Sequence, residues 1–376
     1  MLKLVNKSLL AISAFILAGC AGITSVSTKM PTPTTTVNSY TEWYNLMNKA
    51  INNFETEVSV KIPKYSANVY DIYKLPYPDV QISAKGQTIT KSTGETYSNL
   101  YYTIKYKQNL LLTKAAEDRS FLSHLTAKDQ KLFKQAQDIA ASIIKSGMTP
   151  YEKEKAIHDY MVLNYKYDTS VVFDNSPDNY GPAYRISGLL ENKTGCCEAY
   201  TAMFKLLGTL AGLDVKVAYG CIGKPKATRN GKPVNTHAWN IIKLDGEYYH
   251  IDVTSDDPVP DVKGRIDYTF FNVSDSELAK THTYDKSSSG NISCQGTKYN
   301  FFKYNNLYVN SINEFGALIK REVAKKSKTI YAYTRGFGVK TKNEVQSFFD
   351  TKVVSSFGIS GEAGKAGIYV VTVEYR

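Results

Sequence analysis

Apolar residues recur at helical spacing in three stretches near the middle of the chain. Residues 128–146 carry a run that predicts a core-facing helix: Leu132, Phe133, Ala136, Ile139, Ala140, Ile143 and Ile144. A second helix is expected to begin at Thr149-Pro150, because a capping hydroxyl, an early proline and Glu152 form a typical start. A third helix follows Gly195 and ends near Gly212.

Alternating residues predict strands after the third helix. Residues 214–220 alternate like a half-buried strand, and two further runs, 236–244 and 247–254, flank Asp245-Gly246. Asp-Gly between such runs is the strongest short-range signal for a two-residue β-hairpin.

The hairpin has a register that matters for chemistry. A two-residue turn pairs Leu244 with Glu247. In that register His237 and Asp252 are diagonal neighbours on one face, roughly 7–8 Å apart at the backbone. One imidazole–carboxylate hydrogen bond can close this distance, and the carboxylate would then fix the imidazole tautomer.

Two segments far apart in the chain share one pattern. Residues 37–43, VNSYTEW, have the same skeleton as residues 309–315, VNSINEF, and each Ser-x-x-Glu is a capping box that opens a helix. Each is followed downstream by an alternating strand, at 101–106 and at 369–375. We therefore expect two small α+β modules that flank a central domain, unless these short motifs agree by chance.

The first residues predict export. Lys3 and Lys7 precede a short apolar run that ends in Leu17-Ala18-Gly19-Cys20. This ending resembles the lipobox of bacterial lipoproteins, in which the cysteine is acylated, so Cys20 is the expected lipidation site. The alternative is an ordinary signal peptide cleaved nearby. Residues 21–36 are rich in Ser, Thr and Pro and predict a tether, so we expect an extracytoplasmic protein anchored by lipid to a bacterial cell membrane.

Charge narrows the choice of partners only a little. The formal net charge is +11, and loss of Lys3 and Lys7 with the signal would lower it by two. A basic surface can attract anionic lipid headgroups or wall polymer, or it can have no dedicated partner. The sequence has no nucleic-acid motif, and we expect no nucleic-acid partner. It is silent on the oligomeric state.

Four cysteines remain after Cys20: Cys196, Cys197, Cys221 and Cys294. Outside the cell a disulfide between Cys221 and Cys294 is one possibility, because adjacent cysteines such as Cys196 and Cys197 seldom bridge. No Cys or His spacing typical of zinc occurs, and we expect neither a metal nor an organic cofactor.

Cys197 has a candidate catalytic setting. A thiol at a helix N-terminus lies at the positive end of the helix dipole, and a nearby imidazolium would lower its pKa further. Backbone N–H groups at the same helix start could stabilise an oxyanion. His237 and Asp252 would complete a Cys-His-Asp triad.

These residues carry a resemblance to a known family. The order GCCEAY at 195–200, HAWN at 237–240 and YYHIDVTSDDP at 248–258 resembles the transglutaminase-like superfamily. Residues 151–168 and 268–285 are similar to segments that precede and close the domain in bacterial members. The resemblance covers about 110–290 and implies a papain-like α+β core, in which a helix carrying cysteine packs on an antiparallel sheet carrying histidine and aspartate.

The family pattern Gly-x-Cys-x-Gly-Tyr assigns the residue roles. It matches Gly195, Cys197 and Tyr200, which makes Cys197 the nucleophile and leaves Cys196 as an inert packing residue. The side chains that we expect to line the substrate site are Tyr200, Trp239 and His250. Two positions depart from the commoner pattern, Ala199 in place of glycine and Ser255 where tryptophan is frequent, and they put substrate fit in doubt.

The resemblance implies acyl transfer on protein or peptide amides, through a thioester on Cys197. Attack by an amine would give a crosslink, and attack by water would give deamidation or peptide cleavage, with a cell-wall peptide as one conceivable substrate. The alternative is a catalytically silent scaffold or a wall-binding or protein-binding lipoprotein. The expected domains are a signal peptide at 1–20, a linker at 21–36, an α+β module at 37–107, the catalytic domain at 108–296 and a second α+β module at 297–376.

Overall fold

The computed structural model describes residues 31–33, 35–63, 80–171, 181–225, 228–229, 232–233 and 236–376. The predicted signal peptide, Cys20 and most of the linker lie outside these residues. The chain divides into two compact units, Met1–Lys105 and Tyr106–Arg376. In the described part of the chain, no helix combines the length and the apolar character that crossing a membrane requires.

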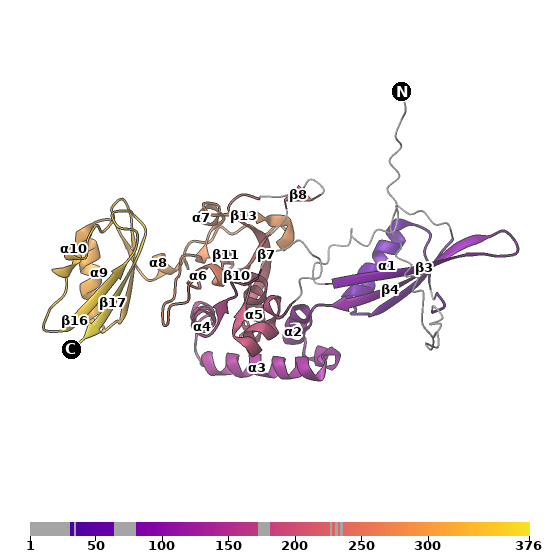
Figure 1. The fold of residues 1–376 in the computed structure, drawn as a ribbon, viewed down its shortest axis with the longest axis horizontal. Helices are drawn as coiled ribbons and strands as arrows, with labels where there is room; N and C mark the ends of the chain where they lie inside the picture. The colour runs from indigo at the N-terminus through magenta and orange to yellow at the C-terminus, as the bar shows by residue number, and fades with distance from the viewer. Residues whose placement is uncertain are drawn as a thin grey trace, which may run out of the picture. The chain divides into compact units, whose positions relative to one another are not determined.

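The first unit is a small α+β sheet with one long helix (Figure 1). Its strands lie in the order β1-β2-β4-β3, and its elements are β1 (Thr35–Thr36), α1 (Tyr40–Asn52), β2 (Glu57–Ile62), β3 (Val80–Thr90) and β4 (Thr96–Tyr106). Ser39 caps α1 by accepting from the N–H of Glu42, as the sequence predicts. The helix packs on the sheet through Trp43, whose indole N–H donates to the hydroxyl of Tyr102 at 2.9 Å.

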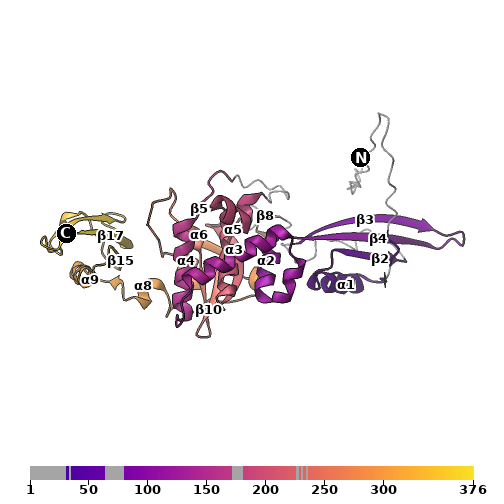
Figure 2. The same cartoon turned by 90° about the horizontal axis from the view of Figure 1, so that it is seen from below.

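The second unit begins with a layer of helices. These are α2 (Gln108–Glu117), the turn η2 (Arg119–His124), α3 (Ala127–Ile143), α4 (Pro150–Asn164), the turns η3 (Pro182–Tyr184) and η4 (Gly188–Asn192), and α5 (Cys197–Leu210). The three predicted helices are confirmed as α3, α4 and α5, and both hydrogen bonds of the capping box between Thr149 and Glu152 are present. Figure 2 shows α3, α4 and α5 together, and α3 and α4 both contact α5.

The central sheet has five strands in the order β12-β11-β10-β7-β13. They are β7 (Asp214–Ile222), β10 (His237–Leu244), β11 (Glu247–Ile251), β12 (Phe271–Val273) and β13 (His282–Asp285), and α5 packs against β7 and β10. Shorter elements lie at its ends: β5 (Lys166–Tyr167), β6 (Thr194–Gly195), β8 (Thr228–Arg229), β9 (Lys232–Pro233), α6 (Val253–Asp256), α7 (Asp275–Leu278) and η5 (Lys286–Ser289). This arrangement of helices on an antiparallel sheet is the α+β core that the sequence predicts.

The predicted hairpin register is confirmed. β10 and β11 are antiparallel, with Leu244 paired to Glu247. The turn residues Asp245 and Gly246 have φ of +48° and +87°, the left-handed backbone that a tight hairpin of this kind requires.

The C-terminal elements repeat the topology of the first unit. Their strands lie in the order β14-β15-β17-β16, with the first pair parallel and the others antiparallel, as in β1-β2-β4-β3. The elements are α8 (Phe301–Tyr304), β14 (Tyr308–Val309), α9 (Ile312–Ala324), β15 (Thr329–Thr334), α10 (Asn343–Gln346), β16 (Val354–Ser360) and β17 (Ile368–Tyr375). Ser311 caps α9 just as Ser39 caps α1, so the sequence repeat corresponds to a repeated structure.

The possible disulfide between Cys221 and Cys294 is not formed in the structure. Both residues are buried, and no bridge joins them. Cys294 packs in an apolar cluster with Trp239, Ile241 and their neighbours, where it acts as a small hydrophobic side chain.

Candidate active site

Cys197 is the first residue of α5, and the backbone before it is tightly held. The N–H of Cys196 donates to the carbonyl of Ala183 at 2.8 Å. A Cβ added to Gly195 would lie 2.9 Å from the Cβ of Ala199, so this approach of the chain to the helix favours glycine. The Cys197 thiol therefore has a fixed place at the positive end of the helix dipole.

His237 and Asp252 form the hydrogen bond that the hairpin register predicts. His237 begins β10, and Asp252 directly follows β11. The Nε2 atom of His237 lies 2.7 Å from Oδ2 of Asp252, and their side chains are 7% and 0% exposed. Since Nε2–H donates to the carboxylate, Nδ1 is the ring nitrogen left for proton exchange with a thiol.

Two further side chains hold Asp252. Ser255 donates its hydroxyl to Oδ2 at 2.6 Å and its N–H to Oδ1 at 3.1 Å. His282 Nε2 lies 3.3 Å from Oδ2. Burial alone would raise the pKa of Asp252, but the charge and hydrogen bond of His237, the nearby His282 and the hydroxyl of Ser255 hold it well below its usual range. Asp252 therefore stays a carboxylate that can stabilise an imidazolium.

The backbone N–H of Ala238, the residue after His237, lies at the Cys197 sulfur and lowers the pKa of its thiol. Two effects oppose it, first a hydrogen bond from the Cys197 thiol to the sulfur of Cys196 and then burial, and together they raise the pKa of Cys197. The same hydrogen bond, with the N–H groups of Glu198 and Ala199, lowers the pKa of Cys196. The pKa of each thiol thus depends on the other, which the sequence did not reveal.

Ser255 and His282 are site residues that sequence reasoning missed. Ser255 was interpreted only as a departure from the family pattern, and His282 was not assigned to the site. The contact of His282 with Asp252 arises because β13 pairs with β7, on the far side of β10 from the hairpin partner β11. The alternation of side chains along the β10–β11 hairpin cannot reveal a neighbour that comes from another strand.

The three residues expected to line the substrate site are all buried. Tyr200, Trp239 and His250 are 0%, 1% and 0% exposed. Tyr200 donates its hydroxyl to Asp257, and the Trp239 ring stacks on His237 with centroids 5.8 Å apart. Their contact with substrate stays a prediction.

A second buried polar network lies behind the site, on α4. His158 Nε2 lies 3.2 Å from Oδ2 of Asp256, and Oδ1 of the same carboxylate accepts from the N–H of Phe270 at 2.9 Å. Asp256 ends α6, the short helix that Asp252 opens. This network therefore fixes the backbone that carries the aspartate of the triad.

Two groups in the described part of the chain have side chains of the kind that bind metals. They are His237, Asp252 and His282, and His250, Asp275 and Cys294, each with potential ligand atoms within 4.8 Å of one another. In both groups an imidazole N–H already donates to the carboxylate, at 2.7 and 2.9 Å. The chemistry considered below uses these hydrogen bonds.

Comparison with known families finds a match in the region that contains the triad residues. Residues 137–253 match the family model described as the transglutaminase-like superfamily. The central part of the chain is transglutaminase-like. The matched region contains Cys197, His237 and Asp252.

The similarity to solved structures is distant. The chain is 17% identical to a TGase, covering 58% of each chain with a TM-score of 0.27. It is 14% identical to a candidate cysteine protease from Cytophaga hutchinsonii, covering 58% of this chain and 74% of that one with a TM-score of 0.25. A candidate protease from Parabacteroides distasonis is 10% identical, with 85% and 65% covered and a TM-score of 0.32. No curated protein matches the sequence.

Proposed function

We propose that this chain is a cysteine enzyme that transfers acyl groups from protein or peptide amides. The observation that carries the proposal is the buried hydrogen bond between His237 and Asp252, 2.7 Å long, beside a cysteine at a helix N-terminus. An imidazole fixed in this way can accept a thiol proton and later return it to a leaving group.

The reaction would proceed in two steps. Cys197 gives its proton to Nδ1 of His237, and its sulfur attacks the amide carbonyl to form a tetrahedral oxyanion. Collapse forms the thioester and breaks the C–N bond, while His237 protonates the departing amine or ammonia. In the second step an amine or water attacks the thioester and gives a proton to His237. Collapse then breaks the C–S bond, and His237 returns that proton to the sulfur of Cys197. Asp252 stays ionised throughout and stabilises the imidazolium.

Thiol reactivity tests this proposal directly. Brief iodoacetamide treatment near neutral pH, followed by mass spectrometry, should alkylate Cys197 much faster than Cys221 and Cys294, which are internal references. His237→Ala should remove this difference, because the thiol loses its base. A Cys197 that reacts no faster than the reference thiols in the unaltered protein would favour the silent scaffold.

A second experiment separates the possible outcomes of acyl transfer. The protein is incubated with a peptide mixture, with and without a biotin-labelled primary amine, and products are identified by mass. Amine incorporation would indicate crosslinking, a mass gain of one deamidation would indicate side-chain hydrolysis, and new termini would indicate peptidase activity. Cys197→Ala is the matched control for each product.

The proposal includes attachment of the protein to the outer face of a bacterial membrane through Cys20. The support is the sequence Leu17-Ala18-Gly19-Cys20 after a short apolar run. Expression in a bacterial host with an alkyne-tagged fatty acid should label the protein, and Cys20→Ala should abolish the label. Unlabelled protein in the soluble fraction would contradict the anchor.

A further inference from the structure

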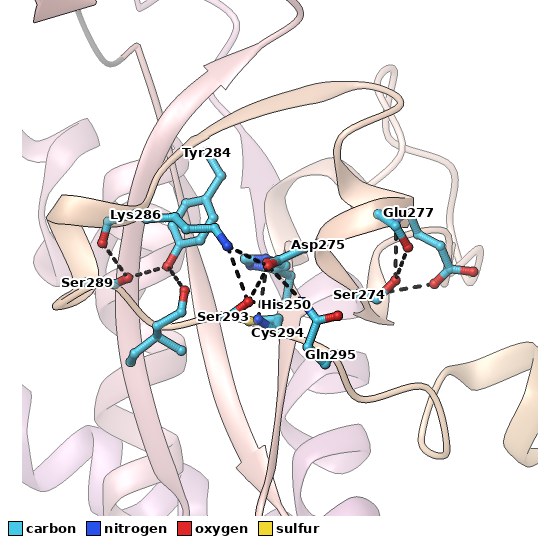
Figure 3. Close-up of polar contacts among 12 residues, drawn as sticks. His250, Ser274, Asp275, Glu277, Tyr284, Lys286, Ser289, Ser293, Cys294 and Gln295 are labelled. Atoms are coloured by element: carbon cyan, nitrogen blue, oxygen red, sulfur yellow. Dashed lines mark hydrogen bonds and ion pairs between the residues drawn. The ribbon is translucent and has the colours of Figure 1, made fainter.

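Asp275 collects an unusual number of hydrogen bonds at the edge of the central sheet. Figure 3 shows His250, Lys286, Ser293 and Gln295 converging on its carboxylate. Oδ2 accepts from Lys286 at 2.8 Å, from the hydroxyl of Ser293 at 2.8 Å and from Gln295 at 3.1 Å. Oδ1 accepts from His250 Nε2 at 2.9 Å and from the N–H of Cys294 at 3.2 Å. The carboxylate is therefore immobilised.

His250 carries this constraint into the core. Its side chain is fully buried. Because Nε2–H donates to Asp275, Nδ1 is the unprotonated nitrogen, and it accepts the indole N–H of Trp239 at 3.0 Å. Burial lowers the pKa of His250. The neutral tautomer that accepts from Trp239 is thus the favoured form.

Trp239 brings the constraint to the triad. Its indole is 1% exposed and stacks on the His237 imidazole, with centroids 5.8 Å apart and planes 28° apart. It also meets His282 edge-on at 5.6 Å. The indole hydrogen bond fixes the rotation of the ring against which His237 lies.

We infer that Asp275, His250 and Trp239 form a positioning chain that sets the ring plane of His237. The inference rests on the proposed function, because these three residues would orient Nδ1 of His237 toward Cys197 while Nε2 stays hydrogen-bonded to Asp252. The positioning chain touches no reacting atom. It acts by holding the base in a reactive geometry, and misplacement of a catalytic group by about 1 Å can lower a rate by about 100-fold.

The test uses two substitutions of His250 in the full chain. His250→Leu removes both hydrogen bonds, whereas His250→Asn keeps an acceptor near the position of Nδ1 for the indole N–H. The probe reaction is acylation of Cys197 by p-nitrophenyl acetate. Its rate is measured from the p-nitrophenol that the reaction releases, at several pH values. Tyr284→Phe is the matched control, because it deletes hydrogen bonds to Ser289 and Ile292 in the same cluster without breaking the chain.

The expected results follow from the geometry. His250→Leu lowers the acylation rate about 10- to 100-fold and changes its pH profile, His250→Asn recovers most of the rate, and Tyr284→Phe stays within about twofold of the unaltered protein. The protein has two tryptophans, so it gives two indole N–H signals by NMR, and Trp239→Phe identifies one of them. That signal should move upfield in His250→Leu but not in Tyr284→Phe.

Two results would overturn the positioning chain. One is an unchanged acylation rate in His250→Leu although the Trp239 signal has moved, and the other is no recovery in His250→Asn. Failure of the proposed function itself looks different, because Cys197 of the unaltered protein would then react as slowly as Cys221 and Cys294. That result would reject both proposals, whereas either of the first two results would reject only the positioning chain.

Discussion

At the scale of single residues, the two sulfur atoms at the start of α5 have unequal roles. The backbone N–H of Ala238 lies at the sulfur of Cys197, the proposed nucleophile, and Cys196 is fully buried beside it. Cys196 makes no side-chain cap on the helix, but the backbone N–H groups of Glu198 and Ala199 favour its thiolate. The sequence presents it as inert packing, whereas the structure gives it influence over the proton of Cys197.

Cys196→Ala should make Cys197 more reactive. The substitution removes the hydrogen-bonded sulfur that raises the pKa of Cys197 most, so the thiol should ionise at lower pH. The measurement is the pH dependence of Cys197 alkylation, whose midpoint should move down, with a faster rate at pH 7. Cys221→Ala, which removes another buried thiol, is the control. An unmoved or raised midpoint would contradict the coupling of the two thiols.

Ser255→Ala should weaken the triad without removing a member of it. The substitution deletes the hydroxyl that donates to Asp252 at 2.6 Å. A hydrogen bond to a charged group contributes about 1.5–3 kcal/mol. Because the other donors to Asp252 remain, the loss of transition-state stabilisation should lie near the lower end of that range. The acylation rate should therefore fall roughly 5- to 30-fold. Ser255→Thr keeps the hydroxyl and should retain most of the rate. Equal losses in both variants would point to packing instead.

At the scale of elements, the sequence predicts what local rules determine. The capping box at Thr149, the two-residue turn at Asp245-Gly246 and the start of α5 are each fixed by neighbours in the chain, and all three are present. The turn also determines the His237–Asp252 contact, because register is inherited along the hairpin.

Contacts across the sheet could not be predicted in the same way. His282 reaches Asp252 only because β13 joins the far side of β7, and nothing in the sequence near His282 specifies that neighbour. The Asp275–His250 bond depends on the same long-range assembly, since α7 packs against β11. The hydrogen bond between His237 and Asp252 could therefore be predicted from the sequence, whereas the contacts of His282 and Asp275 could not.

Glu154 on helix α4 makes the stability of the fold depend on pH. Glu154 is fully buried, its Oε2 accepts from Asn272 at 2.8 Å, and its Oε1 has no hydrogen-bond partner among the residues that the structure describes. Burial raises its pKa from 4.5 to about 8, against the opposing effects of Asn272 and His158. The folded state therefore keeps a proton that the unfolded state releases, so this residue lowers the free energy of unfolding as pH rises from about 4.5 to 8.

Glu154→Gln should remove that dependence. The amide resembles the protonated carboxyl and keeps an oxygen for Asn272, so the variant should match the unaltered protein near pH 4.5. Above pH 8 it should be more stable by roughly 1–3 kcal/mol. The measurement is chemical unfolding followed by circular dichroism at both pH values. If the stability difference between the variant and the unaltered protein is the same at both pH values, Glu154 does not change its ionisation on unfolding.

At the scale of the whole molecule, two copies of one α+β topology stand in different units. The N-terminal copy is in a unit of its own, whereas the C-terminal copy shares a unit with the triad. Contacts within that unit join them: Tyr268 stacks on Phe301 with centroids 3.7 Å apart, and the hydroxyl of Tyr331 donates to the carbonyl of Ile266 at 2.9 Å. Disturbing the C-terminal copy should thus affect the catalytic sheet.

The repeat itself supplies a matched pair of substitutions for this prediction. Trp43 and Phe315 occupy the same position after the capping serines of α1 and α9, and both are 0% exposed. Replacing either by alanine should destabilise its own module by about 3–5 kcal/mol. Phe315→Ala should also lower the temperature at which rapid alkylation of Cys197 is lost, because its module and the catalytic sheet unfold within one unit. Trp43→Ala should leave that temperature unchanged, and a drop as large as in Phe315→Ala would mean that the two units unfold together.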